Sequence, residues 1–292
     1  MIKKSKIGIM GIGMVGKQIC RYFEEIKELK RGKNLFLYDI DPKKAFSDDV
    51  NKADVIFVCV PSPRNPDGSC NISAIDSVFQ MIKEPKIMVI KSTVPPGTTE
   101  MFQKKYPKHK VLFNPEFLTE SQAWEDMIKP DRQIVGFTKK SLDAAHYVLS
   151  LLPQAPFMSP WGSDYKKYMV TATEAEIAKV CANAFFSTKV TFANQVADIC
   201  EYAGADYENV KCAIESDYRI GPSHLNVMHG NYRGFGGYCL PKDIDALIMF
   251  LKASGLNADF FETIRKQNIK LLARQGFTIN QISTHDKDIK LS

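Results

Sequence analysis

The sequence predicts an α/β protein in which a doubly wound parallel sheet is followed by an all-helical part built on one long helix. Apolar stretches that suit strands alternate with amphipathic stretches over the first 160 residues, a pattern typical of a parallel sheet with helices on both faces. A glycine-rich turn, Gly11 to Gly16, follows the first apolar stretch. Residues 173–203 contain neither proline nor glycine, which favours a single long helix.

These patterns give an order of elements along the chain. We expect strands at residues 6–10, 35–38, 54–60, 87–91, 110–113 and 132–137. We expect helices at residues 14–29, 73–83, 98–105, 173–203, 207–215, 241–253 and 258–275, with an irregular loop at 218–238 and a polar tail at 283–292. Thr173, with Glu176 three residues later, is a capping-box pattern that would start the long helix. The change of pattern predicts two domains, residues 1–160 and 161–292.

Composition narrows the function classes. The chain has 292 residues, of which 45% are hydrophobic, enough for a folded core. Its net charge of +6 comes with scattered basic clusters that lack interleaved aromatics, so we expect no nucleic-acid partner. The seven cysteines have neither paired nor metal-ligand spacing, so we expect no metal. The sequence shows no signal peptide and no membrane-spanning apolar run, which favours the cytoplasm and no membrane partner.

The glycine turn has the context of a Rossmann-type dinucleotide site. Its GxGxxG pattern follows a strand and opens a helix, where backbone N–H groups can approach a pyrophosphate closely. Asp39 ends the next strand, where a carboxylate accepts hydrogen bonds from the ribose and repels a 2′-phosphate. We therefore expect NAD rather than NADP, with a purely structural turn as the alternative. The turn residues assigned to the cofactor are Gly11, Gly13, Met14, Val15 and Gly16.

Four further stretches carry chemistry. Lys91 to Gly97 and Asn114 to Glu120 each follow a strand, at the edge where open α/β sheets bind ligands. Glu116 and Glu120 would share one face if a helix begins there, and Lys179 and Asn183 are likewise four apart on the long helix. The fourth stretch is Gly234 to Asp243, GFGGYCLPKD, with Cys239 inside it.

Each stretch also has a structural interpretation. Glu116 and Glu120 could be first-turn acids favoured by the helix dipole, and Lys179 and Asn183 could lie on a solvated face. However, the long helix is apolar on most sides around Lys179, and a buried lysine needs a partner or a function. All four stretches together are hard to explain by structure alone.

Together these stretches resemble the UDP-glucose 6-dehydrogenase family, the UDP-glucose/GDP-mannose dehydrogenases. The matching segments occur in the family's order and cover most of the chain to about residue 275. The segments are Gly11 to Gly16, Val60 to Pro63, Lys91 to Pro95, Asn114 to Ser121, Glu176 to Asn183, Arg219 to Gly221 and Gly234 to Asp243. The family's signature around its catalytic cysteine is close to GFGGxCxPKD.

The resemblance implies a two-step, four-electron oxidation of a nucleotide sugar, UDP-glucose to UDP-glucuronate. The sugar C6 alcohol is oxidised to an aldehyde, and the Cys239 thiolate attacks it to form a thiohemiacetal. A second hydride transfer to NAD gives a thioester, which water hydrolyses. Lys179 and Asn183 would stabilise the oxyanion, and Asp243, Glu116 and Thr93 would handle water and protons.

The resemblance also implies binding roles. Cofactor contacts would come from Asp39, Lys44, Ser62, Ser92, Thr93 and Glu120. Substrate contacts would come from Glu116, Phe117, Leu118, Lys179, Asn183, Arg219, Asn226, Phe235, Gly236 and Gly237. In the family, the arginine at position 219 reaches the substrate from a neighbouring subunit, and the long helix forms the core of a homodimer. We therefore expect a homodimer.

The sequence departs from the family pattern in several places, one of them Thr119, where an arginine or a small residue is common. Only a short segment separates Asp41 from the strand at residue 54, so a helix and a strand of the family are expected to be missing. The segment between Arg219 and Gly234 is longer than usual. The sequence ends at Ser292, where the family continues into another α/β domain that helps hold UDP.

Two alternative functions remain at this point. A β-hydroxyacid-type dehydrogenase also has two domains and a Lys-x-x-x-Asn pair on a long helix, but it lacks the GGYCLPKD segment. A non-catalytic NAD-binding dimer is the other alternative. The presence of Cys239, Lys179, Asn183 and Asp243 argues against it.

Overall fold

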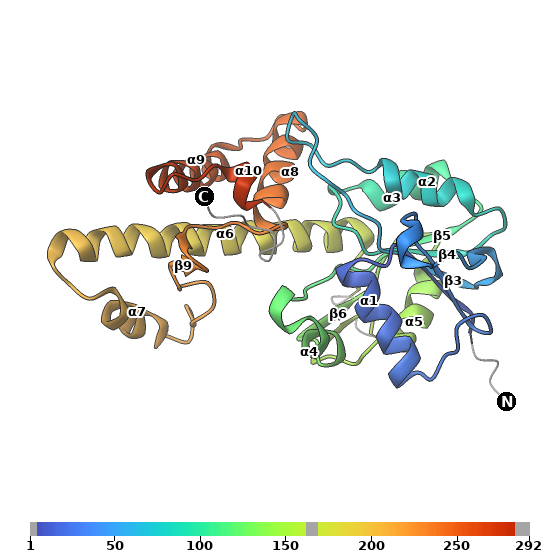
Figure 1. The fold of residues 1–292 in the computed structure, drawn as a ribbon. Coiled ribbons are helices and arrows are strands. Elements are labelled where there is room, and N and C mark those ends of the chain that lie inside the picture. Colours follow the sequence, from blue (N-terminus) through green and yellow to red (C-terminus); the bar gives the residue numbers. More distant parts are fainter. Residues whose placement is uncertain (1–4, 162–168, 284–292) are drawn as a thin grey trace. The chain divides into compact units, whose positions relative to one another are not determined.

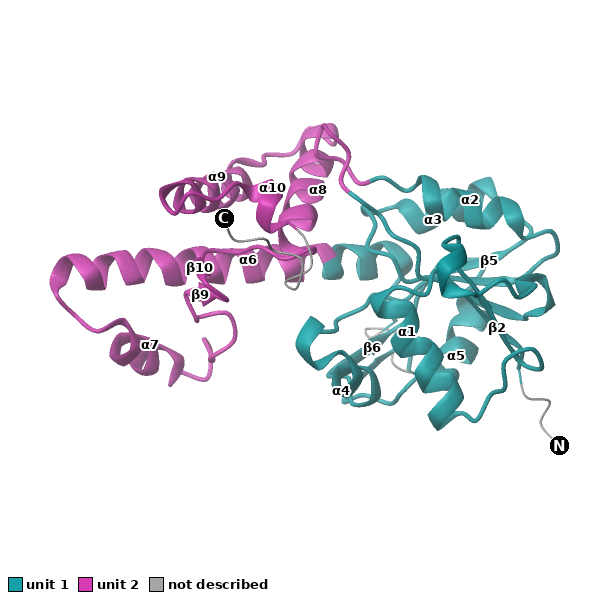
Figure 2. Ribbon diagram, viewed as in Figure 1, with its two compact units in different colours: residues 1–63, 71–179 teal, residues 64–70, 180–292 magenta. Residues whose placement is uncertain are grey.

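The computed structural model describes residues 5–161 and 169–283, and Figure 1 shows its fold. The chain forms two compact units, which Figure 2 draws in different colours. Unit 1 contains residues 1–63 and 71–179, and unit 2 contains residues 64–70 and 180–292. Of the expected polar tail, all but Ser283 lies outside the described residues.

Unit 1 is built on a six-stranded sheet with the strand order β2-β1-β3-β4-β5-β7. The parallel strands are β1 (Ile7–Met10), β2 (Leu35–Tyr38), β3 (Val55–Val58), β4 (Ile87–Ile90) and β5 (Lys110–Phe113). The last strand, β7 (Gly136–Phe137), pairs antiparallel with β5. The strand order reverses at β1, which has β2 on one side and β3 on the other. The doubly wound topology is therefore confirmed.

The sheet has a separate hydrophobic core on each face, because the side chains of successive strand residues point to opposite faces. Ile7 and Ile9 of β1 belong to one core cluster, whereas Met10 belongs to the other. Helices α1 (Met14–Arg21), α4 (Ala123–Ile128) and α5 (Leu142–Leu151) cover the first face. Helices α2 (Ser73–Met81) and α3 (Thr98–Lys105) cover the second (Figure 1).

Two expected elements of unit 1 have a different form in the structure. A single α-helix was expected at residues 14–29. The α-helical part ends at Arg21, and the chain continues as a short π-helix, Tyr22–Ile26. Tyr22 and Phe23, at the start of this π-helix, are both buried. The strand expected at 132–137 is split, because β6 (Arg132–Ile134) pairs with β8 (Phe157–Ser159) while β7 pairs with β5.

The short segment before β3 contains neither a long helix nor a further strand of the sheet, as its length led us to expect. It holds two 3₁₀ turns, Pro42–Lys44 and Val50–Lys52, where the resemblance had suggested a missing helix and strand. The side chains of Asp41 and Asp49 cap these two turns by accepting backbone hydrogen bonds.

The long helix is present as α6 (Ala172–Ala203), but its cap is not the expected one. Glu174 accepts hydrogen bonds from the backbone N–H and the hydroxyl of Thr171, at 2.7 and 2.8 Å. The capping pair is therefore Thr171 and Glu174. The pattern Thr173 and Glu176, which has the same spacing, was the wrong choice, because Glu176 is buried and bonds to another helix.

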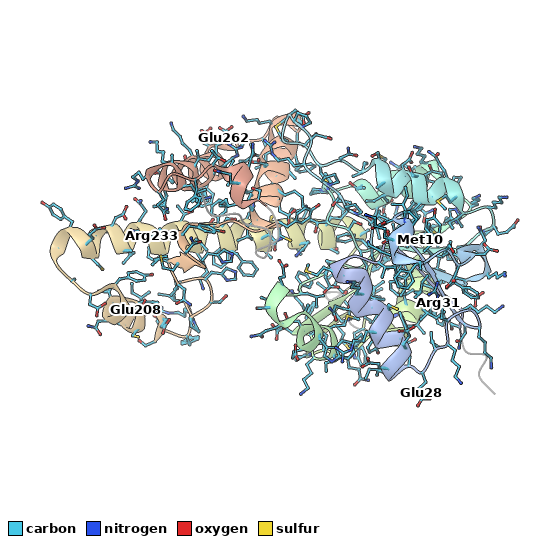
Figure 3. The ribbon with its side chains drawn as sticks, in the orientation of Figure 1. Met10, Glu28, Arg31, Glu208, Arg233 and Glu262 are labelled. Carbon is cyan, nitrogen blue, oxygen red and sulfur yellow. The ribbon has the colours of Figure 1, made fainter. Side chains whose placement is uncertain are left out.

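Unit 2 contains most of α6 and a set of shorter helices. These are α7 (Tyr207–Glu215), α8 (Leu240–Ala253), α9 (Asp259–Arg274) and α10 (Ile279–Ile282). The segment expected to be irregular contains a small hairpin, β9 (Met228–His229) with β10 (Tyr232–Arg233). Arg233, labelled in Figure 3, holds this hairpin to α6 through Asn194 and Asp198.

Residues 64–70 are remote in sequence from the rest of unit 2 but pack on α8. Arg64 forms an ion pair with Asp245 at 2.6 Å, and a β-carbon at Gly68 would lie 3.3 Å from Met249. Among the described residues, no helix is long and apolar enough to cross a membrane.

Candidate functional site

The glycine turn joins the end of β1 to the start of α1. A β-carbon at Gly16 would lie 2.0 Å from the carbonyl oxygen of Gly11, so only glycine lets the helix begin this close to the strand. Gly11 itself has a φ of +91°, which favours glycine. A β-carbon at Gly13, in contrast, would have no heavy atom of the described residues within 4 Å. The N-cap position of α1 therefore borders open space that suits a pyrophosphate, although Val15 in the first turn packs on the core.

Asp39 directly follows β2 and already holds the turn in place. Its carboxylate accepts hydrogen bonds from the backbone N–H groups of Ile12 and Asp41, at 2.7 and 2.9 Å, and from Lys44 Nζ at 2.8 Å. Burial alone would raise the pKa of Asp39, but Lys44 and these backbone donors hold it below its usual value. The carboxylate stays charged and has acceptor capacity left for a ribose.

Two serines connect the loops that follow β3 and β4. Ser62 Oγ donates to the carbonyl oxygen of Thr93 at 2.7 Å, and Ser92 Oγ donates to that of Val60 at 2.5 Å. Ser62 and Ser92 are buried, and their hydroxyls fix the carboxyl edge of the sheet. The residues predicted for the cofactor thus follow the carboxyl ends of β1 to β4, except for Glu120, which follows β5.

Glu116 lies beyond the end of β5 beside a buried lysine. Lys91 Nζ donates to Asn114 Oδ1 at 2.8 Å and lies 2.9 Å from Glu116 Oε2. This second approach is outside hydrogen-bond geometry, so Oε2 is a buried acceptor with no hydrogen-bond donor among the described residues. Such an atom is unusual in a folded protein and is a natural place for a bound water.

The helix on which Glu116 and Glu120 would share one face does not begin at this point of the chain. Residues 114–119 form neither helix nor strand, and Glu120 begins a separate 3₁₀ turn, Glu120–Gln122. The cause is local: Glu116 Oε1 accepts from the N–H of Phe117 at 2.9 Å, and the N–H of Thr119 donates to Asp126. These side-chain bonds compete with helix formation.

Two cations flank the ring of Phe117. The Arg132 guanidinium carbon lies 3.8 Å from the ring centroid and Lys179 Nζ lies 5.3 Å from it. Lys179 is buried, with 9% of its surface exposed, so the solvated-face interpretation of this lysine was wrong. Leu118, the next residue, packs on the core of unit 1.

In unit 2, Asn183 and Asp243 meet although they are far apart in sequence. Asn183 Nδ2 donates to Asp243 Oδ2 at 2.5 Å, and Lys242 Nζ donates to Oδ1 at 2.5 Å. All three side chains are buried. Burial alone would lower the pKa of Lys242, but the Asp243 carboxylate more than offsets this and raises it above the ordinary value. Cys239 is exposed and forms the N-cap of α8, one turn before Asp243.

The glycines that precede Cys239 are needed by the fold itself. The backbone of Phe235 is held on both sides by the side chain of Asn268, at 2.8 Å each. A β-carbon at Gly236 would lie 2.1 Å from Tyr232 Oη. Gly237 donates its N–H to the carbonyl oxygen of Ile282 at 2.9 Å. Close approach to a sugar stays a prediction for these residues, and packing is a second reason for them.

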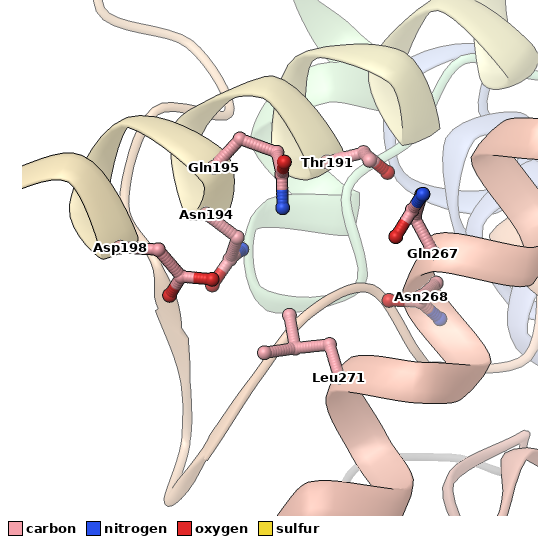
Figure 4. A pocket seen from close by; sticks show the side chains of 7 residues that line it. All are labelled: Thr191, Asn194, Gln195, Asp198, Gln267, Asn268 and Leu271. Carbon is pink, nitrogen blue, oxygen red and sulfur yellow. The ribbon is translucent and has the colours of Figure 1, made fainter.

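The last two predicted substrate residues make local contacts in unit 2. Arg219 is exposed and pairs with Asp217 of its own turn, and Asn226 Oδ1 accepts from Lys211 Nζ at 2.9 Å. A small cavity of about 10 Å³ between α6 and α9 (Figure 4) is too small for a cofactor. The described residues that line it are Thr191, Asn194, Gln195, Asp198, Gln267, Asn268 and Leu271.

The predicted residues therefore form two groups, one in each unit. Unit 1 holds the glycine turn, Asp39, Lys44, Ser62, Ser92, Thr93, Glu116, Phe117, Leu118, Glu120 and Lys179. Unit 2 holds Asn183, Arg219, Asn226, Phe235, Gly236, Gly237, Cys239 and Asp243. Sequence reasoning did not assign roles to Lys91, Arg132 and Lys242. Lys91 and Lys242 lie inside motifs that were recognised, and only the fold shows their partners.

The fold and the glycine turn define a protein with a Rossmann-type NAD-binding unit joined to a helical unit. Two family models agree with this division: the NAD binding domain of the UDP-glucose/GDP-mannose dehydrogenase family matches residues 43–149, and its central domain matches residues 173–270. The chain belongs to the UDP-glucose/GDP-mannose dehydrogenase family, and its cofactor is NAD.

Known proteins resemble this chain over most of its length. It is 30% identical to a UDP-glucose 6-dehydrogenase of Rickettsia bellii over 298 aligned positions, which cover 99% of this chain and 63% of the relative. It is 34% identical to UDP-glucose 6-dehydrogenase 5 of Oryza sativa over 84% of this chain and 52% of the relative. The chain thus spans less than two thirds of the length of these relatives.

Solved structures show the same fold. A UDP-glucose dehydrogenase of Pyrobaculum islandicum superposes with a TM-score of 0.76 at 26% identity, over 94% of this chain and 73% of that one. A UDP-D-ManNAc dehydrogenase of Pyrococcus horikoshii gives a TM-score of 0.75 at 20% identity, over 93% of this chain and 70% of that one. The second likeness concerns the fold alone.

Proposed function

We propose that this chain oxidises the C6 alcohol of a nucleotide sugar to a carboxylate in two NAD-dependent steps, with UDP-glucose as the substrate. The observation that carries the proposal is the arrangement at the start of α8. Cys239 is exposed there, one helical turn from the buried Asn183–Asp243–Lys242 network. An accessible thiol beside buried, charged hydrogen-bonding groups suits covalent catalysis better than packing.

The open turn at Gly13 and the anchored Asp39 fit the cofactor. Backbone N–H groups of Met14 and Val15 would hold the pyrophosphate, and Asp39 with Lys44 would hold the ribose. Ser62, Ser92, Thr93 and Glu120 would line the nicotinamide side. When bound, NAD supplies the hydride acceptor for both oxidations.

The covalent steps belong to Cys239. Its thiolate forms a bond to the aldehyde carbon, and the carbonyl electron pair moves onto the oxygen, giving a thiohemiacetal. Lys179 and Asn183 would stabilise that developing negative charge with an ammonium and an amide donor. Oxidation of this adduct leaves a thioester, which water then cleaves to give the carboxylate and the thiol.

The water needs a site and a proton acceptor. Glu116 Oε2 is buried and lacks a hydrogen-bond donor among the described residues, which suits it to hold the attacking water. Thr93 and Asp243 would complete the proton path. The remaining substrate contacts would come from Phe117, Leu118, Arg219, Asn226, Phe235, Gly236 and Gly237.

We also propose that the protein is a homodimer through α6. Cys181, Phe185, Phe192, Ile199 and Tyr202 are all exposed along this helix. Phe185, Phe192 and Ile199 are 60%, 50% and 65% exposed and are spaced by seven residues, so they lie on one helix face. A second copy of α6 would cover this stripe in the manner of a coiled coil.

Replacement of Cys239 by serine tests the covalent role. We expect Cys239→Ser to fold normally, because Cys239 is exposed, and to stop after the first oxidation. Mass spectrometry should then detect the aldehyde or a slowly cleared adduct. Cys212→Ser, at another exposed cysteine on α7, is the control and should keep wild-type activity. A Cys239→Ser enzyme that forms the carboxylate at the wild-type rate would refute this role.

A further inference from the structure

Glu176 is a buried carboxylate that joins two separate helices of unit 1. It lies on the second turn of α6 and has 0% of its surface exposed. Its Oε2 accepts from the N–H of Gly97 at 2.6 Å. Its Oε1 accepts from the N–H of Thr99 at 2.7 Å and from the Thr99 hydroxyl at 2.6 Å. A side chain of α6 thus binds the start of α3.

The start of α3 needs such a partner. Gly97 is its N-cap and makes no side-chain cap bond, so the first N–H groups of α3 depend on an acceptor from elsewhere. A carboxylate at a helix N-terminus is also favoured by the helix dipole. Glu174, two residues earlier, caps α6 itself through Thr171 in the same manner. The two glutamates are chemically alike but hold different elements.

The segment between β4 and α3, residues 91–97, carries Ser92 and Thr93. Its first half is fixed to the β3 loop by Ser62 and Ser92. Its second half is fixed by Glu176, which binds Gly97. The loop is therefore held at both ends, and one of the two anchors comes from α6.

The same helix carries Lys179. It follows Glu176 by three residues, so both side chains lie on the same side of α6. Lys179 Nζ lies near Phe117, beside Glu116. Displacement of Glu176 would therefore shift the loop with Thr93 relative to Lys179.

We propose that Glu176 is a positioning residue that sets the loop 91–97 against the first turns of α6, so that Thr93 and Lys179 keep a fixed separation. This inference rests on the proposed function for the roles of these two residues. Burying a carboxylate is costly, and a cost of this kind is more readily explained at a site where geometry matters. Misplacement of reacting groups by about 1 Å can cost roughly 100-fold in rate.

The test compares Glu176→Gln with Glu174→Gln, the matched change on the same helix. In Glu176→Gln an amide donor would face a backbone N–H of α3. We expect amide hydrogen exchange at residues 92–99 to accelerate in Glu176→Gln and to stay at the wild-type rate in Glu174→Gln. With UDP-glucose, Glu176→Gln should lose roughly 10-fold or more in kcat, with little change in the KM for the sugar.

The pH dependence of unfolding provides a second readout. The pKa of Glu176 is raised to about 7. Burial is the main cause and the charge of Glu100 adds to it, whereas the three hydrogen bonds lower the pKa and offset part of the rise. The contribution of this carboxyl group to stability is therefore complete below about pH 4.5 and is lost as the pH rises through about 7. The unfolding free energy of wild type minus that of Glu176→Gln should fall across this interval.

If Glu176→Gln fails to fold, Thr99→Val takes its place in the test. This variant removes one of the three hydrogen bonds to Glu176 with little change in shape, so its effects on exchange and kcat should be smaller. The proposal is overturned if exchange at residues 92–99 is unchanged, or if Glu174→Gln loses as much kcat as Glu176→Gln. If wild type oxidises no nucleotide sugar, the proposed function fails separately. The positioning role is then tested by amide hydrogen exchange with added NAD. We expect NAD to slow exchange at residues 92–99 in wild type but not in Glu176→Gln.

Discussion

Gly13 and Gly16 belong to one turn but have opposite surroundings. A β-carbon at Gly16 would collide with the Gly11 carbonyl, whereas one at Gly13 would enter open space. Gly13 also has an extended backbone, with φ at −88°, which any residue adopts. A side chain at position 13 would therefore occupy the space proposed for the pyrophosphate without disturbing the fold.

We predict that Gly13→Val keeps the thermal stability of wild type and loses NAD binding, as measured by calorimetric titration. Gly16→Ala is the contrasting variant and should be destabilised, because the collision is with backbone and cannot be relieved by a rotamer change. If Gly13→Val binds NAD with wild-type affinity, the turn is not the cofactor site.

Some of the residues that sequence motifs singled out meet in the fold, although their catalytic roles stay predictions. The GFGGYCLPKD segment and the Lys179 helix pointed to Cys239, Asn183 and Asp243, and the structure joins the last two by a hydrogen bond. Glu176 was misread because Thr171 to Glu174 and Thr173 to Glu176 have the same spacing. Only burial, a tertiary property, decides between the two registers.

At the scale of elements, α6 combines two surfaces. One face is buried in the unit cores through Val180, Ala184 and Val190. Another face is exposed and apolar, with Phe185 and Phe192 at its centre. A monomer in water would leave this stripe uncovered, which is the usual mark of an interface.

We predict a dimer at micromolar concentration in sedimentation velocity. The double change Phe185→Asp and Phe192→Asp should give monomers, because two charges would be buried without partners. Phe260→Asp is the control, since Phe260 is 58% exposed on α9 and is outside the stripe, and it should leave the dimer intact. A wild-type monomer under these conditions would exclude the proposed interface.

Element types were predictable because the apolar patterns are strong, whereas some boundaries depended on contacts remote in sequence. Helix α7 was predicted with both ends correct, and α3 likewise. The strand at 132–137 was split because its two halves pair with different strands. Glu116 and Glu120 do not share a helix face after β5, since side-chain bonds to the backbone of Phe117 and Thr119 compete with helix formation there.

At the scale of the molecule, the family is established and the activity is a proposal. The chain matches both the NAD binding domain and the central domain models, but it spans 63% of the first relative's length. The fold does not identify the sugar, because superposable structures bear the names of dehydrogenases for different nucleotide sugars. Substrate choice depends on a few side chains, which a backbone pattern does not reveal.

The stoichiometry of the reaction tests the central claim most directly. Purified protein is incubated with NAD and UDP-glucose, and the NADH formed is counted against the sugar nucleotide consumed. We predict two NADH for each UDP-glucose and UDP-glucuronate as the product, because the aldehyde is expected to stay bound to Cys239 between the two oxidations. One NADH for each substrate, with free aldehyde released, or no consumption at saturating substrate, would contradict this prediction.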